Sequence, residues 1–223
     1  MTDHPILWSF RRCPYAMRAR LAVQASGLQV ELREILLRDK PEAFLATSPS
    51  ATVPCLRLPS PAPESVPESV PEPVIDESLD IMIWALKQQD PHGLLDMPEA
   101  GWQLIATNDG PFKTALDHTK YAVRYPDLDP DAEREKASAF LYDLDAQLAG
   151  QEALFGARWR VADLAILPFV RQFANIDRPW FDAQPWPNLI LWLDAFTNSE
   201  DFGRVMVKPP PWRPEDAPLW FGG

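Results

Sequence analysis

The sequence predicts a small α/β domain, residues 1–87, followed by an all-helical domain, residues 99–223. Up to residue 87, short apolar runs alternate with stretches whose apolar residues recur at helical spacing. This order is typical of a layer of strands covered by helices. Beyond residue 99 the strand-like runs fade and helical spacing dominates. The chain has 223 residues, of which 46% are hydrophobic, so apolar material is sufficient for a core in each domain.

The elements of the α/β domain follow from the apolar runs and the residues that flank them. Met17 and Leu21 repeat at helical spacing after the first run, and Gly27 is suited to end that helix. Pro54 lies near the start of a later apolar run. The expected order is strand, helix, strand, short helix and strand, over residues 6–10, 14–26, 30–36, 41–46 and 53–58.

Residues 59–73 interrupt this pattern with proline, glutamate and serine, and the tetrapeptide Glu-Ser-Val-Pro occurs there twice. Such a composition cannot build a core, so we expect an extended, solvated loop without a function of its own. The alternative is an acidic lid or a partner-docking arm. A short strand at residues 74–75 and a helix beginning at Ser78 are expected next. Residues 88–98 contain two prolines and a glycine, which indicates the connection between the domains.

The helical domain contains three strong patterns and an irregular end. Residues 161–173 are apolar on nearly all sides, which predicts a central buried helix. Another helix is expected at residues 188–196. One face of a long helix is marked by Ala137, Leu141, Leu144 and Leu148. The tail from residue 209 is rich in proline and aromatic residues, and it is expected to pack over the surface without regular structure.

The composition argues against several classes of protein. The formal net charge is −11, which disfavours a nucleic-acid or anionic-membrane surface because both need basic patches. No apolar run approaches the length of a membrane span, and no signal peptide is evident. Two cysteines in a chain of this length do not form a disulfide framework, so a cytoplasmic location is expected. The cysteines and the three histidines lack metal-ligand spacing, so no metal site is expected.

Cys13 is the strongest candidate for a catalytic residue. It lies between the first apolar run and the first helix, where backbone N–H groups and the helix dipole stabilise a thiolate. Pro14 then occupies the first helical position. A buried, inert cysteine is the alternative. Ala16 stands where a dithiol motif would place its second cysteine, so Cys13 is expected to act as a monothiol. Cys55 follows Pro54 within a strand and is expected in the core.

Five segments in sequence order resemble the cytosolic glutathione transferase superfamily, in particular its cysteine-type members, the omega class and the two-domain bacterial glutaredoxin. They are Cys13-Pro14-Tyr15 with Arg18, Arg20 and Leu21; Lys40-Pro41-Glu42; Val53-Pro54; Glu77-Ser78 ahead of an apolar helix; and Gly156 with Ala162-Asp163. The resemblance implies a thioredoxin-like N-terminal domain, an all-α C-terminal domain, a homodimer and a cis bond at Val53–Pro54.

The chain departs from this family pattern at Arg160. The family places Ser or Thr there, three residues before the aspartate equivalent to Asp163, and so forms a capping box. Without a Ser or Thr side chain at position 160, the reciprocal half of the capping box is lost. Asp163 is still expected to accept backbone N–H bonds at the start of the buried helix, in a structural role.

The resemblance further implies glutathione as the co-substrate, bound by the first domain. The implied glutathione-binding residues are Pro14, Tyr15, Lys40, Val53, Pro54, Glu77 and Ser78. A cis bond at Val53–Pro54 would leave the Val53 backbone N–H and C=O free to pair with the extended tripeptide. Ser78 suits the γ-glutamyl carboxylate, Glu77 the α-amine and Lys40 the glycyl carboxylate. The alternatives are that Ser78 only caps a helix and that Lys40 is a solvated surface lysine.

A pocket for the second substrate is expected in the helical domain. Residues 108–125 should form a helix that faces the first domain and carries most of the candidates. The candidate pocket residues are Phe112, Lys120, Tyr121, Arg124 and Trp180. The alternative is that the aromatic members pack between the domains and that the charged members are solvated.

A monothiol Cys13 in this family pattern implies a glutathione-dependent thiol transferase or reductase that acts through a mixed disulfide. Its partners would be glutathione and a small disulfide or electrophile. Two alternatives stay open. Cys13 could conjugate or reductively dehalogenate an electrophile, or the chain could be a non-catalytic binding or scaffold protein with the same fold.

Overall fold

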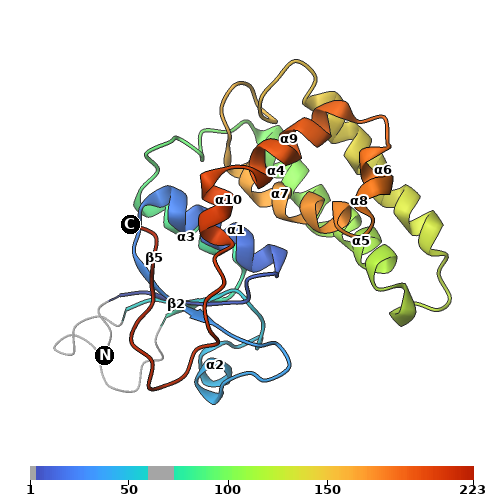
Figure 1. Ribbon diagram of the computed structural model, residues 1–223. Coiled ribbons are helices and arrows are strands. Elements are labelled where there is room, and N and C mark those ends of the chain that lie inside the picture. Colours follow the sequence, from blue (N-terminus) through green and yellow to red (C-terminus); the bar gives the residue numbers. More distant parts are fainter. Residues whose placement is uncertain (1–3, 60–72) are drawn as a thin grey trace. The chain divides into compact units, whose positions relative to one another are not determined.

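The computed structural model describes residues 4–59 and 73–223, so most of the predicted loop at 59–73 lies outside the described residues (Figure 1). Its strands are β1 Ile6–Ser9, β2 Val30–Glu34, β3 Cys55–Arg57, β4 Val74–Ile75 and β5 Trp220–Phe221. They form one sheet in the order β4-β3-β1-β2-β5. β1 runs parallel to β2, and the other neighbouring pairs are antiparallel. The first four strands lie where the sequence predicts strands.

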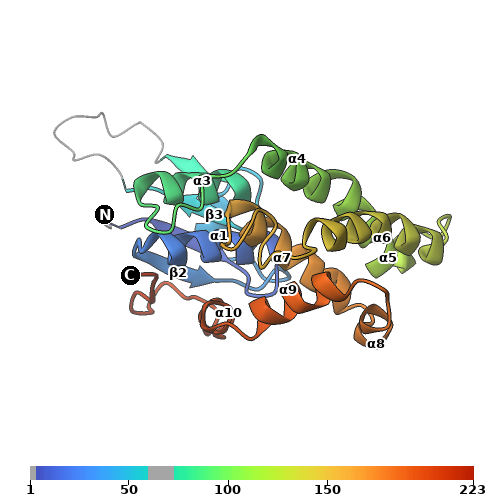
Figure 2. The same cartoon turned by 90° about the horizontal axis from the view of Figure 1, so that it is seen from above.

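The sheet is accompanied by α1 Pro14–Ser26, α2 Glu42–Thr47 and α3 Ser78–Gln88. α1 and α3 pack against each other over the strands, as Figure 2 shows from above, and α2 lies on the other side in Figure 1. Phe44 of α2 packs on Trp8 of β1, with 5.6 Å between the ring centroids. Gly27 ends α1 with φ +71°, a left-handed conformation that glycine adopts without a Cβ clash. The predicted helix end is therefore confirmed.

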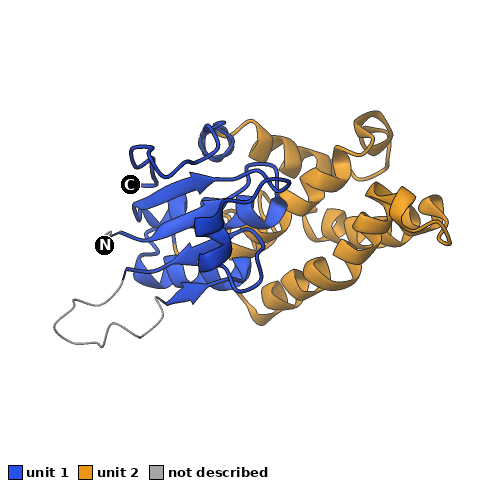
Figure 3. Cartoon of the chain, turned by 90° about the horizontal axis from the view of Figure 1, so that it is seen from below, with its two compact units in different colours: residues 1–92, 200–223 blue, residues 93–199 orange. Residues whose placement is uncertain are grey.

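The chain divides into two compact units, residues 1–92 with 200–223, and residues 93–199 (Figure 3). The first unit contains the sheet, and the second contains helices, which confirms the predicted fold class. The sequence prediction placed residues 99–223 together in the helical domain. In the structure, the last part of that range, 200–223, is grouped with the first unit instead.

The tail joins the first unit because it supplies hydrogen bonds and apolar surface to it. α10 Glu200–Val205 packs on α1, and β5 pairs with the outer edge of β2. The Trp212 N–H donates to the Glu34 carbonyl, and the Leu32 N–H donates to the Leu219 carbonyl, both at 2.8 Å. The prediction of a tail without regular structure is therefore wrong at β5, because two extended residues become a strand only through their neighbour.

The second unit packs its helices around a buried one. These helices are α4 Glu99–Thr107, α5 Lys113–Lys120, α6 Pro130–Gln147, α7 Val161–Ala174, α8 Arg178–Asp182 and α9 Pro187–Thr197. α7 is buried along most of its length, as predicted for residues 161–173. The predicted apolar face of α6 is also buried, and α9 covers the predicted helix at 188–196.

The predicted helix at residues 108–125 is interrupted in the structure. A π-helical turn, η1 Asn108–Phe112, joins α4 to α5, and a 3₁₀ turn, η2 Ala122–Arg124, follows. Pro111 explains the first irregularity, because it lacks the N–H that a regular α-helical turn would need at that position.

Asp163 holds the start of α7. Its carboxylate accepts the backbone N–H of Leu154 at 3.0 Å and of Arg160 at 2.8 Å, and the Trp192 indole N–H at 3.0 Å. Burial raises the pKa of this carboxyl, and the three hydrogen bonds oppose that rise. The Arg160 side chain, which has no acceptor atom, donates instead to the Gly93 carbonyl at 2.6 Å. The expected backbone bonds to Asp163 are confirmed.

Candidate functional site

Cys13 is the N-cap residue of α1, with φ −73° and ψ 124°. Its N–H donates to the Phe10 carbonyl at 3.0 Å, and its own carbonyl accepts the Met17 N–H at 2.9 Å. The thiol is half-buried. It therefore lies at the positive end of the α1 dipole, a position that stabilises a thiolate relative to a thiol.

The Val53–Pro54 bond is cis, as predicted, and the Val53 carbonyl lies beside Cys13. The Cys13 Sγ is 3.7 Å from that carbonyl oxygen, so the thiol can donate a weak hydrogen bond to it. The Val53 N–H takes part in no hydrogen bond among the described residues. The Val53 carbonyl is thus next to the thiol, and the Val53 N–H is left without a hydrogen bond among the described residues.

Two of the basic residues near Cys13 in sequence stack on aromatic rings. The Arg12 guanidinium lies 5.4 Å from the centroid of the Phe10 ring. The Arg18 guanidinium lies 5.3 Å from the centroid of the Tyr15 ring. These cation–π contacts hold the two arginines beside the Cys13 turn.

Arg20 holds the segment that precedes Cys13. Its side chain is only 1% exposed. The guanidinium donates to the Ser9 hydroxyl, to the Arg11 carbonyl at 2.8 Å and to the Val205 carbonyl at 3.1 Å. One buried side chain thus joins the end of β1, the turn before Cys13 and α10.

Glu34 completes this support from the end of β2. The Arg11 N–H donates to its Oε1 at 2.6 Å. Burial raises the pKa of the Glu34 carboxyl, against the effects of that hydrogen bond and of the charges of Arg20 and Arg11. Burial lowers the pKa of Arg20 to about 10, whereas the charges of Glu34 and of a Cys13 thiolate raise it. Because this last interaction is mutual, the Arg20 charge favours the thiolate form of Cys13.

Glu77 and Ser78 begin α3. Glu77 is the N-cap residue and is exposed, whereas Ser78 is the first helical residue and is 2% exposed. The Ser78 Oγ accepts a hydrogen bond from Arg18 Nε at 3.0 Å, which leaves the hydroxyl hydrogen as a donor. The N-cap position thus belongs to Glu77, and Ser78 is not the capping residue of α3.

Lys40 does not extend into solvent. Its Nζ donates to the Ala51 carbonyl at 3.0 Å, so the ammonium lies against the loop that leads to Val53. Ala51 has φ +53°, a left-handed conformation that costs a non-glycine residue about 1 kcal/mol. Backbone strain of this kind is common where a loop forms a binding site.

Asp76 fixes the same loop from the other side. Its carboxylate accepts the Ser48 hydroxyl at 2.8 Å and the Ser50 N–H at 2.9 Å. Burial raises the pKa of Asp76, but the hydrogen bonds from Ser50 and Ser48 outweigh it and hold the pKa below its usual value. Cys55 is buried, as predicted, and burial with the nearby Asp76 carboxylate raises the pKa of its thiol to about 12. Cys55 therefore stays a protonated thiol at neutral pH.

The candidates for a second-substrate pocket do not share one cavity. Phe112 is 2% exposed and packs between Phe140 and Phe173, at centroid distances of 5.1 and 6.0 Å. Phe112 also lines a cavity of about 660 Å³ in the second unit. Trp180 lines a different cavity, of about 510 Å³.

The other three candidates form a small cationic group on an aromatic ring. The Lys120 ammonium lies 5.3 Å from the centroid of the Tyr121 ring, and the Arg124 guanidinium lies 4.6 Å from it. These contacts place two positive charges beside one phenol ring at the end of α5.

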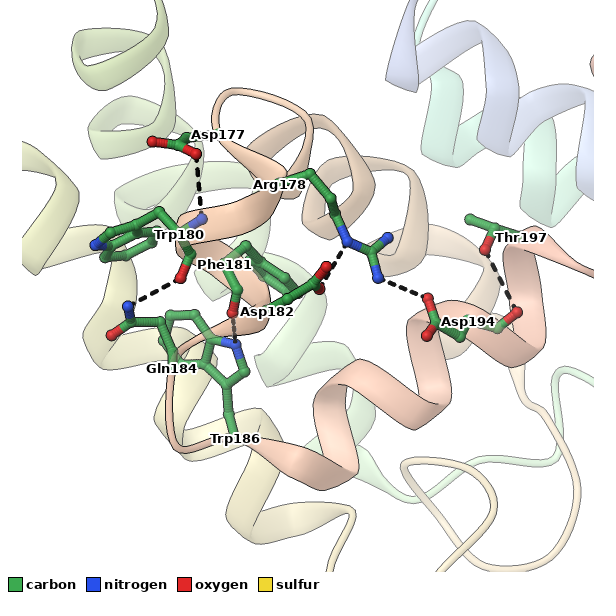
Figure 4. A network of polar contacts seen from close by, with 9 residues as sticks. All are labelled: Asp177, Arg178, Trp180, Phe181, Asp182, Gln184, Trp186, Asp194 and Thr197. Carbon is green, nitrogen blue, oxygen red and sulfur yellow. Dashed lines mark hydrogen bonds and ion pairs between the residues drawn. The ribbon is translucent and has the colours of Figure 1, made fainter.

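A polar network fixes Trp180 on α8 (Figure 4). The Trp180 N–H donates to Asp177 at 3.1 Å, and its carbonyl accepts the Gln184 amide at 2.9 Å. Arg178 joins α8 to α9 by donating to Asp182 at 2.7 Å and to Asp194 at 2.8 Å. These hydrogen bonds therefore fix the short helix α8 that carries Trp180.

The described residues contain no group of three or more His, Cys, Asp and Glu side chains that could hold a metal ion. Within the same residues, every helix is too short or too polar to cross a membrane.

Two family patterns match the chain in the order of its units. The pattern described as "Glutathione S-transferase, N-terminal domain" covers residues 7–93, and "Glutathione S-transferase, C-terminal domain" covers residues 122–195. The chain belongs to the glutathione S-transferase family. The first match contains Cys13, the cis bond and the start of α3, so the geometry above lies in the N-terminal domain of a glutathione S-transferase.

Among curated members of this family, local similarity is found with two omega-class proteins. The chain is 40% identical to glutathione S-transferase omega-1 of Sus scrofa over 50 residues, which are 22% of this chain and 21% of that protein. It is 38% identical to glutathione S-transferase omega-2 of Mus musculus over 50 residues, 22% of this chain and 20% of that protein. The matches thus span about a fifth of each relative.

Solved glutathione transferases share the fold over nearly the whole chain. One from Pseudomonas putida, with one glutathione disulfide bound per subunit, has a TM-score of 0.76 at 17% identity, and the match covers 93% of each chain. One from Pseudomonas fluorescens, with two glutathione molecules bound, has a TM-score of 0.73 at 19% identity, covering 92% of each chain. Glutathione transferase Omega 3C of Trametes versicolor has a TM-score of 0.71 at 16% identity, covering 92% of this chain and 85% of that one.

Sequence reasoning missed three residues that shape this glutathione S-transferase site. Arg20 was part of the family resemblance, but no role was assigned to it, and Glu34 and Asp76 received none. Each has at least one partner more than ten residues away in the chain. The only local signal was charge within an apolar stretch, which is costly to bury unless it is paired.

Proposed function

We propose that this member of the glutathione S-transferase family is a glutathione-dependent thiol transferase in which Cys13 is the nucleophile. The observation that carries the proposal is the position of the Cys13 thiol at the N-terminus of α1, 3.7 Å from the Val53 carbonyl. A helix N-terminus stabilises a thiolate, and a thiolate attacks disulfides. Ala16 leaves no second thiol in the motif, so the chemistry is that of a monothiol.

The reaction has two thiol–disulfide exchanges. The Cys13 thiolate attacks the glutathione sulfur of a mixed disulfide, forms a Cys13–glutathione disulfide and releases the other partner as a thiolate, which takes up a proton. A second glutathione, as its thiolate, attacks the glutathione sulfur on Cys13. This step releases oxidised glutathione and regenerates the Cys13 thiolate, so the mixed disulfide and one free glutathione become oxidised glutathione and the free thiol of the other partner.

The residues around Cys13 suit the groups of glutathione. We propose that the Val53 N–H and C=O pair with its main chain, as an added strand would. The exposed Glu77 carboxylate suits the α-amine, and the Ser78 hydroxyl with the α3 N-terminus suits the γ-glutamyl carboxylate. Lys40, held beside the same loop, suits the glycyl carboxylate.

Pro14 and Tyr15 complete the proposed glutathione site. Pro14 fixes the first turn of α1 directly after the nucleophile. Tyr15, with Arg18 against its ring, offers a flat surface beside the tripeptide. The relatives support the ligand, because solved structures with this fold hold glutathione or its disulfide.

For the second substrate we propose a small disulfide or electrophile. Tyr121, with the two charges beside it, and Trp180 are the candidates for contacts with it. We also expect a cytoplasmic homodimer, as in many members of the family. Sedimentation of the purified protein tests the oligomeric state.

Replacing Cys13 by Ala tests the proposal. Reduction of bis(2-hydroxyethyl) disulfide by glutathione should fall at least about 100-fold, because the only activated sulfur is lost. The intact mass after exposure to oxidised glutathione should rise by one glutathione in the parent protein and not in the variant. Cys55→Ala is the matched control and should keep both properties, since its thiol is buried and protonated.

Full disulfide reduction by the Cys13→Ala variant would refute the assignment. Conjugation of 1-chloro-2,4-dinitrobenzene without any disulfide reduction would point to the alternative transferase chemistry. If the protein formed no glutathione adduct and calorimetry detected no binding of glutathione, the remaining reading would be a non-catalytic binding protein with this fold.

A further inference from the structure

The turn before Cys13 is bonded to distant parts of the first unit through Arg11. The Arg11 N–H donates to Glu34 Oε1 at 2.6 Å, at the end of β2. The Arg11 carbonyl accepts Arg20 Nη2 of α1 at 2.8 Å. Its side-chain Nη1 donates to the carbonyl of Met206, the residue after α10, at 3.3 Å. Arg11 thus joins β2, α1 and the end of α10 at a point two residues ahead of the thiol.

The end of α10 supplies acceptors for both arginines. Carbonyl groups in the last turn of a helix have no partner within the helix, so they accept hydrogen bonds from donors elsewhere. The carbonyl of Val205, the last residue of α10, accepts Arg20 Nε at 3.1 Å, and the next carbonyl, that of Met206, accepts the Arg11 side chain. α10 in turn packs on α1 (Figure 1). Two successive carbonyls therefore hold two guanidinium groups in place.

Arg11, Arg20 and Glu34 form a charge cluster behind the Cys13 turn. Two of these side chains carry a positive charge and one carries a negative charge, which leaves one positive charge in excess when all three are ionised. Burial raises the pKa of the Glu34 carboxyl, whereas the charges of Arg20 and Arg11 lower it. Glu34 and Arg20 are buried, so water screens their charges less than it would at the surface.

The thiol of Cys13 lies within the field of this cluster. Burial lowers the pKa of Arg20, whereas a charged Cys13 raises it, and this second interaction is mutual. Arg12 and Arg18, the other charged residues of the turn, lie on aromatic rings. Cys13 also packs against the apolar cluster that contains Cys55, whose thiol stays protonated because burial raises its pKa to about 12.

We propose that Arg11 is a positioning residue for the Cys13 thiolate and that Glu34 sets how strongly it acts. The end of α10 and the Glu34 carboxylate hold Arg11, and Glu34 offsets one of the two arginine charges. Removing the charge of Arg11 disfavours the thiolate, and removing the charge of Glu34 favours it. This inference rests on the role proposed above for Cys13 as the nucleophile.

Alkylation of Cys13 by iodoacetamide across a pH range tests the proposal on the folded, full-length protein. Mass spectrometry resolves the Cys13 adduct, and the midpoint of the rate profile gives the pKa of its thiol. Arg11→Met should raise this midpoint by at least about half a pH unit, because a nearby positive charge is lost. Arg11→Lys keeps the charge and should raise the midpoint by less than half as much.

Glu34→Gln separates the effect of charge from that of structure. The amide oxygen of the new side chain can still accept the Arg11 N–H, but the two arginine charges lose their counter-charge. The midpoint should therefore fall by at least about half a pH unit. Structural damage alone would move the Arg11→Met and Glu34→Gln profiles in the same direction. Far-ultraviolet circular dichroism checks that each variant is folded.

Arg12→Met is the matched control. It removes the same charge from the position next to Cys13, but Arg12 is exposed and its guanidinium lies 5.4 Å from the centroid of the Phe10 ring. Because water screens an exposed charge, the midpoint should shift by less than about 0.2 pH unit.

A parent midpoint near the ordinary cysteine value of about 8.5 would refute the activated thiol on which this inference and the proposed function both depend. A low parent midpoint that Arg11→Met leaves unchanged would overturn this inference alone. An equal shift in Arg12→Met, or a rise in Glu34→Gln, would also overturn it, because neither result fits a charge held by Glu34 and α10.

Discussion

At the scale of single residues, Cys13 combines a local signal with long-range support. Its place between an apolar run and a helix is visible in the sequence, and the structure confirms it as the N-cap of α1. The cis Val53–Pro54 bond and the start of α3 at Ser78 were also predictable from short motifs. Arg20 had no predictable role, because its three partners come from β1, the Cys13 turn and α10.

Replacing Arg20 by Met should lower the free energy of unfolding by about 3 kcal/mol, because the acceptors on Ser9, Arg11 and Val205 lose a buried donor. The same change should slow alkylation of Cys13 by iodoacetamide, because the thiolate loses a nearby positive charge. Urea unfolding and mass-resolved alkylation measure the two effects. Arg38→Met, at an exposed position, is the control. A stability loss below about 1 kcal/mol would contradict the supporting role of Arg20.

Asp76 gives the protein a predictable dependence on acid. Its folded pKa lies below the ordinary value of 3.8, so its hydrogen bonds stabilise the fold above that pH and are lost as the pH falls through the folded pKa. Asp76→Asn should therefore lower the melting temperature at pH 7, and the difference from the parent should shrink below pH 3.8. Melting curves across this range test it. Asp80→Asn, an exposed carboxyl on α3, should show no such trend.

At the scale of elements, the first four strands and the longest helices were predictable, whereas the two-residue β5 was not. Gly27 and the apolar repeat set the ends of α1, and the apolar residues of α7 mark a helix that must be buried. β5 is only two residues long, and its pattern is indistinguishable from an irregular tail. The register with Val30 and Glu31 exists only because the tail returns to β2.

Gly222→Ala should release β5 from the sheet. Gly222 has φ +83°, and a Cβ there would overlap the Leu28 carbonyl oxygen. The N–H of Leu32, which donates to the Leu219 carbonyl, should then exchange with deuterium at least about tenfold faster, as mass spectrometry would show. Gly203→Ala, where a Cβ meets no atom within 4 Å, serves as the matched control. Unchanged exchange at Leu32 would mean that β5 tolerates the side chain.

At the scale of the whole molecule, the chain is organised as two units whose boundary does not follow a single cut in the sequence. The first unit is completed by residues 200–223. Trp212 shows why this return is favourable. Its ring packs 5.0 Å from the Trp8 ring, and the Arg33 guanidinium lies 4.4 Å from it.

A chain that ends at Val205 should be less stable than the full chain by about 3 kcal/mol, because β2 loses its edge partner and Trp8 loses the Trp212 ring. Urea unfolding monitored by circular dichroism measures the difference. Trp212→Ala should show part of the loss, since it keeps β5. Equal stability of the truncated and full chains would show that the tail does not support the first unit.

The family resemblance implied the cis proline. The sequence by itself determined the two kinds of domain, the monothiol at the first helix and the acidic character of the chain. These features depend on residues close together in the sequence, where periodicity, helix capping and composition act directly. Only the tertiary structure decided the support of Cys13 by Arg20 and Glu34, the pairing of β5 with β2, and the contact of Arg11 with the end of α10. Each of these needs groups brought together from distant segments, because burial and edge pairing are properties of the assembled chain rather than of any one stretch.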